Sequence, residues 1–408
     1  LKLKRMKILS ILVLFSIVFF VSVSGQNQWS LIKGNYITIG MTCSFQSAND
    51  GWVAGSSGST ESLLLHTTNG GRNLTNTPQD VSGAMWMSVR FSKDGRTGIT
   101  AGLGSSLINA PVAEVTTNSG KFWNATNSKL LFSVSQSVDV IDNQNLVIAG
   151  SWATALGDGA DGIQLSSDAG ETWAQKPWTS DTSVRYCSGV NPSTVFVTGG
   201  MWPSTDEQTR SVSENGRQLS RHLFVDPQRQ EMVWRQARTQ RSAVDSPLEG
   251  YQAVISLTTD AGLTWTELVN DPNQGYYFNQ IDCVSQRHCI VVGEGADASG
   301  ASVAYVWSTD DGFKSTTKTT VPNASLMAVS SLNSTHAWIG GAQPSPTGGA
   351  AALFMSTVDG GKTWRTAQSS LNDFAVTDIS TVSGNAAFAA GITRFGLSSL
   401  AGYGPVDE

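Results

Sequence analysis

A short polar turn that ends on tryptophan recurs along this chain. The clear copies read TVDGGKTW, SSDAGETW, TTDAGLTW and TTNSGKFW, and weaker copies read TTNGGRNL and STDDGFKS. Their third residues are Asn69, Asn118, Asp168, Asp260, Asp310 and Asp359, at successive steps of 49, 50, 92, 50 and 49 residues. A period near 50 residues that holds several short strands is typical of a β-propeller. The spacing of this turn therefore predicts a repeat fold before any chemistry is considered.

An apolar run that ends in glycine precedes each turn and marks the same point of every repeat. These glycines are Gly55, Gly102, Gly150, Gly200, Gly293, Gly341 and Gly391. The seventh copy has no complete turn after it, and the segment NQWSLIKG at 27–34 is available to complete that repeat. Pairing the first strand with the last would leave no open edge in the ring. We expect an all-β chain with a single seven-bladed propeller; six blades with a frayed C-terminal unit is the alternative.

The N-terminal residues have the pattern of a secretory signal peptide. Four basic residues precede an apolar run over residues 8–23, and small residues follow before Gln26. We expect residues 1–25 to be removed and residues 26–408 to form the propeller; an uncleaved membrane anchor is the alternative. Removal leaves 22 Lys and Arg against 32 Asp and Glu, a net charge of −10. Such an acidic protein is a poor partner for nucleic acid or for an anionic membrane.

The chain contains four sequons that could be glycosylated if the protein is secreted. We expect a protein that is secreted or held in the lumen of the secretory pathway, where Asn-x-Ser/Thr sequons can be N-glycosylated. The asparagines of the sequons are Asn73, Asn124, Asn323 and Asn333.

The 92-residue step contains an insertion in the fourth blade. Residues 203–249 are rich in arginine and acidic residues and show little β patterning. Such composition favours a disordered surface loop, with a binding arm as the alternative.

The residue types of the turn predict a structural role. A carboxylate or amide at the third position can accept hydrogen bonds from main-chain N–H groups of its own turn. Glycine at the fifth position, such as Gly361, tolerates a positive φ. The tryptophan can then fold back and pack between neighbouring strands, which applies to Trp123, Trp173, Trp265 and Trp364.

These turns resemble the Asp-box, or bacterial neuraminidase repeat. Together with strands such as GWVAG they look most like the photosystem II stability/assembly factor family, over about residues 35–395 apart from the insertion. The resemblance implies a propeller without catalytic activity that binds protein through one face. The blades carry few arginines outside the insertion, so a basic docking face is not evident from the sequence.

Candidate catalytic chemistry is limited to acidic residues near the inner strands. Sialidase activity would need an arginine cluster that the blades do not offer. Glycoside hydrolysis needs two facing carboxylates, and Asp139, Asp282 and Asp378 are the candidates. The four histidines show no metal-ligand spacing, so we expect no metal and no cofactor.

The cysteines predict one local disulfide. Cys283 and Cys289, in CVSQRHC, flank a tight connection between adjacent strands, and a secreted chain favours their pairing. Cys43 and Cys187 are expected to be buried free thiols in distant blades.

The hypothesis from sequence is a secreted, monomeric, non-catalytic binding protein. Its ligand would be a protein or a glycan held on a propeller face. The alternative is a carbohydrate-active enzyme that uses the channel carboxylates.

Overall fold

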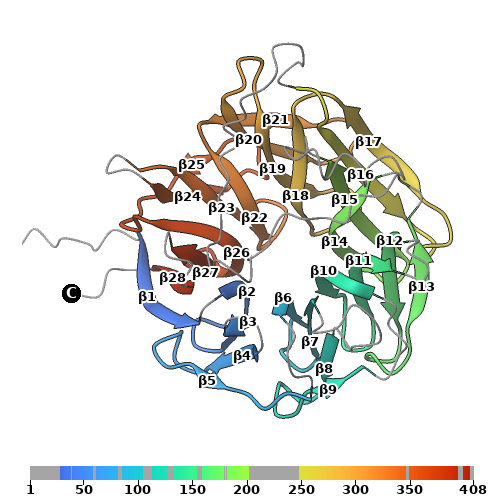
Figure 1. Cartoon of the computed structure of the whole chain (residues 1–408), viewed down its shortest axis with the longest axis vertical. Coiled ribbons are helices and arrows are strands. Elements are labelled where there is room, and N and C mark those ends of the chain that lie inside the picture. Colours follow the sequence, from blue (N-terminus) through green and yellow to red (C-terminus); the bar gives the residue numbers. More distant parts are fainter. Residues whose placement is uncertain are drawn as a thin grey trace, which may run out of the picture.

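The chain forms a ring of seven four-stranded blades around a central channel, as Figure 1 shows. The computed structural model describes residues 28–37, 39–57, 61–80, 85–103, 113–126, 132–153, 159–178, 180, 182–201, 248–345, 349–393 and 398–404. The predicted seven-bladed propeller is confirmed, and the six-blade alternative is wrong. The predicted signal peptide and nearly all of the insertion at 203–249 lie outside the described residues.

Within each blade, antiparallel strands run outward from the channel. The inner strands are β2 (Ile39–Phe45), β6 (Met85–Phe91), β10 (Phe132–Val140), β14 (Ser183–Asn191), β18 (Tyr276–Cys283), β22 (Ser325–Ser331) and β26 (Phe374–Ser383). The second strands are β3 (Gly51–Ser57), β7 (Gly98–Leu103), β11 (Leu146–Ala153), β15 (Thr194–Met201), β19 (Cys289–Ala296), β23 (Ala337–Pro344) and β27 (Ala386–Thr393).

The third and fourth strands form the outer half of each blade. The third strands are β4 (Glu61–Thr67), β8 (Ala113–Thr116), β12 (Gly159–Ser166), β16 (Gln252–Thr258), β20 (Ser302–Thr309), β24 (Ala350–Thr357) and β28 (Ser398–Gly404). The outer strands are β5 (Thr75–Asn76), β9 (Asn124–Ala125), β13 (Ala174–Pro177), β17 (Thr266–Pro272), β21 (Thr317–Pro322), β25 (Arg365–Thr366) and, in the last blade, β1 (Gln28–Ile37).

The N-terminal strand closes the ring, as the sequence predicted. β1 is the outer strand of the last blade and pairs with β28 along its length. Its Trp29 is fully buried, lies stacked on Phe354 with ring centroids 3.8 Å apart, and meets the edge of Trp338. The Trp29 N–H also donates to the carbonyl of Gln368 in the preceding blade, at 3.0 Å. The ring and the main-chain N–H of Trp29 therefore both attach the first strand to the sixth blade.

The glycines that mark the repeats lie opposite a bulge in each inner strand. Gly102, for example, pairs with Trp86 immediately before the register shifts to Ser88. A Cβ on Gly102 would lie 1.9 Å from the Met85 carbonyl oxygen, so only glycine fits. In the fourth blade the corresponding residue is Gly199, one position before the Gly200 read from the sequence. A bulge changes the direction of the side chains that follow it, which here lie at the channel.

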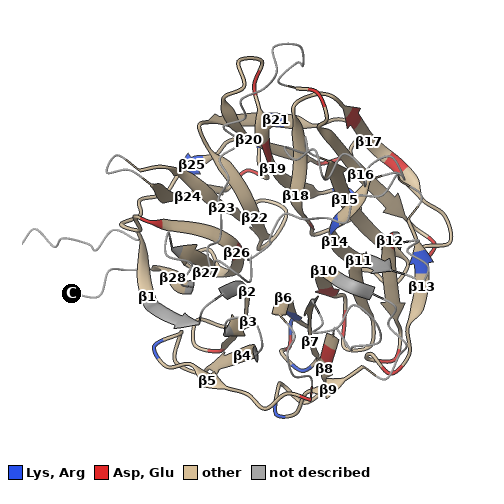
Figure 2. Cartoon of the chain, in the orientation of Figure 1, with Lys and Arg blue, Asp and Glu red and all other residues tan. Residues whose placement is uncertain are grey.

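Charged residues lie mostly on turns and outer edges of the ring (Figure 2). Apolar side chains fill the spaces between blades, in clusters that join each blade to its neighbour. Among the described residues, no helix has the length and apolar character to cross a bilayer.

Candidate functional site

All seven inner strands contribute to one cavity in the central channel. The cavity has a volume of about 170 Å³. Its walls are Cys43, Ser44, Arg90, Val138, Asp139, Tyr186, Cys187, Ser188, Gln280, Ile281, Asp282, Val329, Ser330, Ile379 and Ser380. Most of these side chains are polar, and they come from the stretch of each inner strand that follows its bulge. The channel is therefore the place where the fold concentrates hydrogen-bonding groups.

Among the described residues, ten polar side chains of the inner strands bond to the next blade. Each accepts a hydrogen bond from a main-chain N–H of the following inner strand, as the Ser188 hydroxyl does from Cys283 at 3.0 Å. We call these residues the belt: Thr42, Ser88, Ser137, Asp139, Ser188, Gln280, Asp282, Ser330, Asp378 and Ser380. Every pair of neighbouring blades, including the first and last, is linked by at least one belt bond. The belt closes the ring on the inside, as β1 closes it on the outside.

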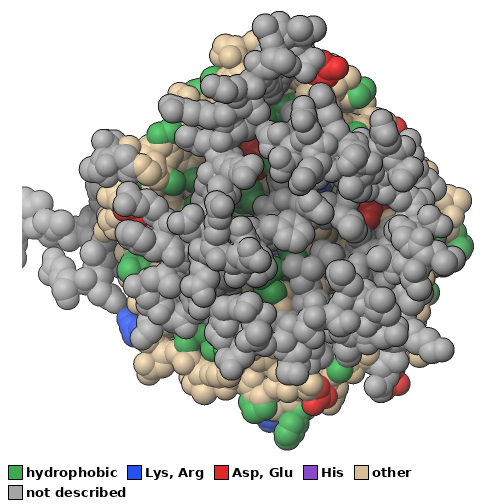
Figure 3. Space-filling model, in the orientation of Figure 1, with side chains coloured by type: hydrophobic (Ala, Val, Ile, Leu, Met, Phe, Trp, Pro, Cys, Tyr) green, Lys and Arg blue, Asp and Glu red, His purple; other side chains and the backbone are tan. Residues whose placement is uncertain are grey.

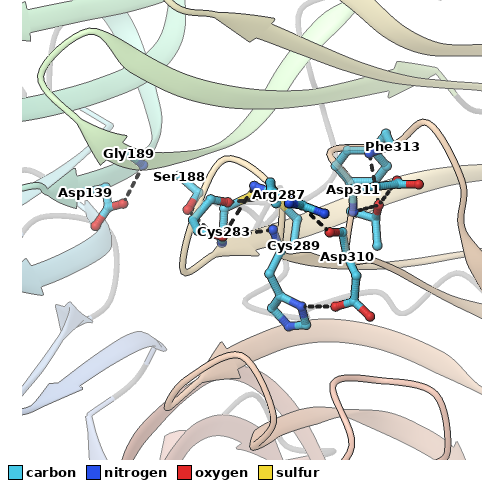
Figure 4. Close-up of a disulfide and its surroundings, with 12 residues drawn as sticks. Asp139, Ser188, Gly189, Cys283, Arg287, Cys289, Asp310, Asp311 and Phe313 are labelled. Atoms are coloured by element: carbon cyan, nitrogen blue, oxygen red, sulfur yellow. Dashed lines mark hydrogen bonds and ion pairs between the residues drawn. A yellow bond between two sulfur atoms is a disulfide. The ribbon is translucent and has the colours of Figure 1, made fainter.

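The three carboxylates that the sequence singled out all belong to the belt. Asp139 accepts the Gly189 N–H at 2.8 Å, a bond drawn in Figure 4, and Asp282 accepts the Ser331 N–H at 2.5 Å. Burial raises the pKa of Asp282 to about 6, with the charge of Asp139 adding to the rise and the Ser331 N–H opposing it. Burial likewise raises the pKa of Asp139, against the bond from Gly189. Both side chains line the cavity.

Asp378 differs because it forms a buried ion pair with Arg90. The two guanidinium nitrogens of Arg90 lie 2.8 and 2.9 Å from the two carboxylate oxygens, a bidentate arrangement. Asp378 also accepts the Thr42 hydroxyl at 2.7 Å and the Cys43 N–H at 3.1 Å. Arg90 donates in addition to the Tyr186 hydroxyl across the channel. The pair and its hydrogen-bond partners therefore join the first, second, fourth and last blades, and both oxygens of Asp378 are engaged.

The recurring turns lie between the third and fourth strands and make the same bonds in each blade. In the sixth blade the Thr357 hydroxyl donates to Asp359 at 2.8 Å and accepts the Gly361 N–H at 2.9 Å. Asp359 also accepts the Thr363 N–H at 2.9 Å. Asn69, Asn118, Asp168 and Asp260 make the corresponding bonds in their own turns. The fourth residue of each turn donates to the turn between the first two strands of the same blade.

In the fifth blade the structure corrects the predicted residue. Asp311, rather than Asp310, accepts the Thr309 hydroxyl and the Ser315 N–H, each at 2.9 Å. Phe313 takes the place of the fifth-position glycine, with φ of +67°. Its ring is buried against Phe196 of the preceding blade. In the other turns a glycine occupies this position and lies close to a side chain of the preceding blade. The sequence suggested the wrong register because Gly312 was taken for the fifth position, although it is the fourth.

The tryptophans of the turns pack against the preceding blade. Trp123 is almost completely buried and meets the edge of Trp52, with ring centroids 5.4 Å apart. The Trp265 N–H donates to the Pro177 carbonyl of the preceding blade at 3.0 Å. Trp173, Trp265 and Trp364 are only partly buried, so burial of the tryptophan varies among the turns.

Asp310 instead belongs to a contact between turns. Its carboxylate accepts a hydrogen bond from Nδ1 of the buried His288 at 2.7 Å and lies 3.5 Å from the Lys362 ammonium of the next blade. Among the described residues, no group of three or more His, Cys, Asp or Glu side chains is arranged to hold a metal ion.

The predicted disulfide is confirmed. Cys283 and Cys289 are paired across the β18–β19 hairpin, with their Cα atoms 4.1 Å apart (Figure 4). Cys43 and Cys187 are buried free thiols on the channel wall, and burial raises the pKa of Cys187 to about 12.

The asparagines of the four sequons are all exposed. Asn73 and Asn124 lie at or just after turns on the outer side of their blades, and Asn323 and Asn333 lie in connections next to β22. Their glycosylation stays a prediction.

The functional residues that the sequence did not single out are Arg90, Tyr186, Gln280 and the belt serines. A signal was present, because most inner strands carry two polar residues separated by one position, as in Gln280 and Asp282. This spacing places both on one face of a strand. The sequence did not predict the bulge in each inner strand, which turns that face toward the neighbouring blade.

Comparison with known proteins identifies the fold but no family. No family model and no curated protein matches the chain. Among solved structures, YCF48 bound to a D1 peptide has 14% sequence identity and a TM-score of 0.54, covering 94% of this chain and 98% of that one. YCF48 from Cyanidioschyzon merolae has 14% identity and a TM-score of 0.55, covering 93% and 99%. A GH74 xyloglucanase from Xanthomonas campestris has 13% identity and a TM-score of 0.49, with 53% of that chain covered. The chain thus has the seven-bladed propeller fold of YCF48, a photosystem II assembly factor.

Proposed function

We propose that the chain is a secreted, non-catalytic binding protein that holds a protein or a glycan on one face of its propeller. The observation that carries the proposal is the belt, because the carboxylates of the channel connect neighbouring blades. A channel built in this way is a rigid support for a binding face.

The belt is a poor arrangement for glycoside hydrolysis. That reaction needs one carboxylic acid to protonate the leaving oxygen and one carboxylate to attack the sugar or activate water. Asp378 is held by Arg90 on both oxygens. Asp139 accepts main-chain N–H groups on both oxygens, from Gly189 and from Val140. Because their oxygens already take part in bonds between blades or within their own strand, these side chains have a structural role.

A protein ligand is supported by the fold. The solved structure of YCF48 bound to a D1 peptide is an example of this fold with a peptide ligand. Among the atoms of described residues that are visible in Figure 3, hydrophobic and acidic side chains are more prominent than basic ones. Such a surface suits a neutral or weakly basic ligand better than an acidic one.

Secretion is supported by the chemistry of the cysteines and by the sequons. A buried disulfide within a hairpin is typical of oxidising compartments. The exposed sequon asparagines are accessible to the glycosylation machinery of such a compartment.

One observation favours the alternative function. Asp282 has a pKa raised to about 6, which suits a general acid near neutral pH. A glycoside hydrolase with Asp282 as acid is therefore the second candidate.

A paired assay distinguishes the two functions. The purified protein is applied to a glycan array and a peptide array, and it is incubated with a broad panel of glycosides. We expect saturable binding on one array and no turnover above background. Turnover that Asp282→Asn abolishes would establish the enzyme instead, because that substitution keeps an oxygen to accept the Ser331 N–H and removes only the titrating proton.

A further inference from the structure

The charges at the central cavity do not balance among the described residues. Arg90 is the cation on the cavity wall, and its charge is matched by Asp378. Asp139 and Asp282 are further carboxylates on the same wall. One cation therefore faces three carboxylates, which leaves two negative charges when both are ionised.

The carboxylates of Asp139 and Asp282 face the same cavity, although they belong to the third and fifth blades. Besides burial, the charge of Asp139 raises the pKa of Asp282, and the charge of Arg90 opposes this rise. Neither has a cationic partner among the ion pairs of the described residues. Partly buried carboxylates without a counter-ion attract a cation more strongly than exposed ones, because water screens them less.

Gln280 adds a hydrogen-bond donor to the cavity wall. Gln280 is 3% exposed, and its carbonyl oxygen accepts the Val329 N–H at 2.8 Å, which fixes the orientation of its amide. The amide Nε2 then faces away from that bond, and it has no hydrogen-bond partner among the described residues. This amide donor on the cavity wall is available to donate to a ligand oxygen or to a water.

The size of the cavity restricts what can enter. A volume of about 170 Å³ holds on the order of ten water molecules. A lysine or arginine side chain fits that space together with a few waters. A sugar chain or a folded segment does not.

We propose that the cavity binds a primary ammonium or guanidinium group, supplied by a lysine or arginine side chain of a peptide ligand. Asp139 and Asp282 pair with the cation, and Gln280 Nε2 donates to an oxygen next to it. The Tyr186 ring lies beside the site and already has the Arg90 guanidinium 6.0 Å from its centroid. This inference rests on the proposed function, since it assigns the chemistry of one anchor of the bound peptide.

The test uses short capped peptides and the intact protein. The probes are acetyl-Gly-Lys-Gly-amide and acetyl-Gly-Arg-Gly-amide, with the Ala and Glu peptides as references and agmatine as a free cation. Binding is followed by calorimetry and by saturation-transfer NMR at pH 7.5. We expect the Lys or Arg peptide to bind at least about tenfold more tightly than the Ala and Glu peptides.

Two matched variants locate the site. The double variant Asp139→Asn/Asp282→Asn keeps an acceptor oxygen at each belt bond and removes both charges, so it should lose at least about tenfold in affinity while its melting stays cooperative. Asp297→Asn removes one charge from the exposed β19–β20 connection and should leave the affinity unchanged. Affinity should also fall as the pH drops from 7.5 to 5, because Asp282, with a pKa of about 6, takes up a proton, whereas the pKa values of Arg90 and Tyr186, which face the cavity, are raised and lie above this range.

Each outcome decides the proposal. Equal binding of the Lys and Ala peptides, absence of binding, or unchanged affinity in the double variant would overturn it, and the propeller face would still be open to a ligand without a basic anchor. Binding of agmatine without binding of either peptide would keep the cation site but show that its ligand is a free amine, which refutes the peptide source. If the wild-type protein bound nothing on either the glycan array or the peptide array, that result would instead contradict the proposed function.

Discussion

Removing Asp378 should destabilise the propeller more than any other belt substitution. In Asp378→Ala the Arg90 guanidinium stays buried without its bidentate partner, and the Cys43 N–H loses its acceptor. Breaking a buried ion pair from one side typically costs about 3–5 kcal/mol. The Tyr186 hydroxyl and the Val89 carbonyl continue to accept from Arg90, so we expect a loss of about 3 kcal/mol.

A double-mutant cycle separates the pair from its surroundings. Arg90→Met alone leaves the carboxylate of Asp378 buried, and it should also cost about 3 kcal/mol. Arg90→Met/Asp378→Ala removes both charges together, so it should cost clearly less than the sum of the single variants.

Urea denaturation, followed by tryptophan fluorescence and far-ultraviolet circular dichroism, measures the unfolding free energy of the wild type, the two single variants and the double variant. Equal m-values would show that the change lies in stability rather than in the unfolded state. A loss below about 1 kcal/mol for Asp378→Ala, or strictly additive losses in the double variant, would refute the claim that this pair holds the first, second and last blades together.

Further predictions concern the turns, the pH and the disulfide. Trp123→Ala should lower the unfolding free energy by about 3–5 kcal/mol, and Trp364→Ala by roughly half as much because that ring is only partly buried; similar losses in urea melts would mean that burial does not set the contribution. Since the folded-state pKa of Asp282 is about 6 and the value for free Asp is 3.8, the wild type should lose stability as pH rises from about 4 to 6. Asp282→Asn lacks this loss, so its unfolding free energy relative to the wild type should rise by on the order of 2 kcal/mol over that range, and a difference that stays constant with pH would contradict the assignment. Cys289→Ser opens a loop of six residues and should cost about 2 kcal/mol in melts under non-reducing conditions, whereas an unchanged midpoint would show that the hairpin is held by its packing alone.

The fold could be predicted from the sequence because its repeats are local. A turn and a strand that recur every 50 residues each carry their own chemistry, such as the hydroxyl and carboxylate of Thr357 and Asp359, so the blade count follows from spacing. The disulfide was predictable for the same reason, since only one hairpin lies between Cys283 and Cys289.

The register errors arise where two residues of one type are adjacent. The fifth turn contains Asp310 and Asp311, and pattern alone places the glycine that follows at the fifth position. The buried ring of Phe313 decides otherwise, because tertiary packing against Phe196 outweighs the cost of a positive φ. The same holds for Gly199 and Gly200, where the bulge selects the first glycine.

The channel could be predicted only in part. Its acidic residues were visible as polar positions on inner strands, but their partners are more than 40 residues away in sequence, as with Asp139 and Gly189. Arg90 and Asp378 are separated by 288 residues and meet only because the ring closes. A periodic sequence pattern does not reveal contacts of this kind. The sequence therefore suggested Asp139, Asp282 and Asp378 as catalytic candidates, whereas in the structure they bond to neighbouring blades.

Amide hydrogen exchange tests the central claim, that the channel carboxylates join neighbouring blades. The Ser331 N–H lies at the channel and has Asp282 as its acceptor. The account predicts slow exchange of this amide in the wild type and in Asp282→Asn, and exchange at least about tenfold faster in Asp282→Ala. Fast exchange of the Ser331 amide in the wild-type protein, or equal protection in all three proteins, would contradict it.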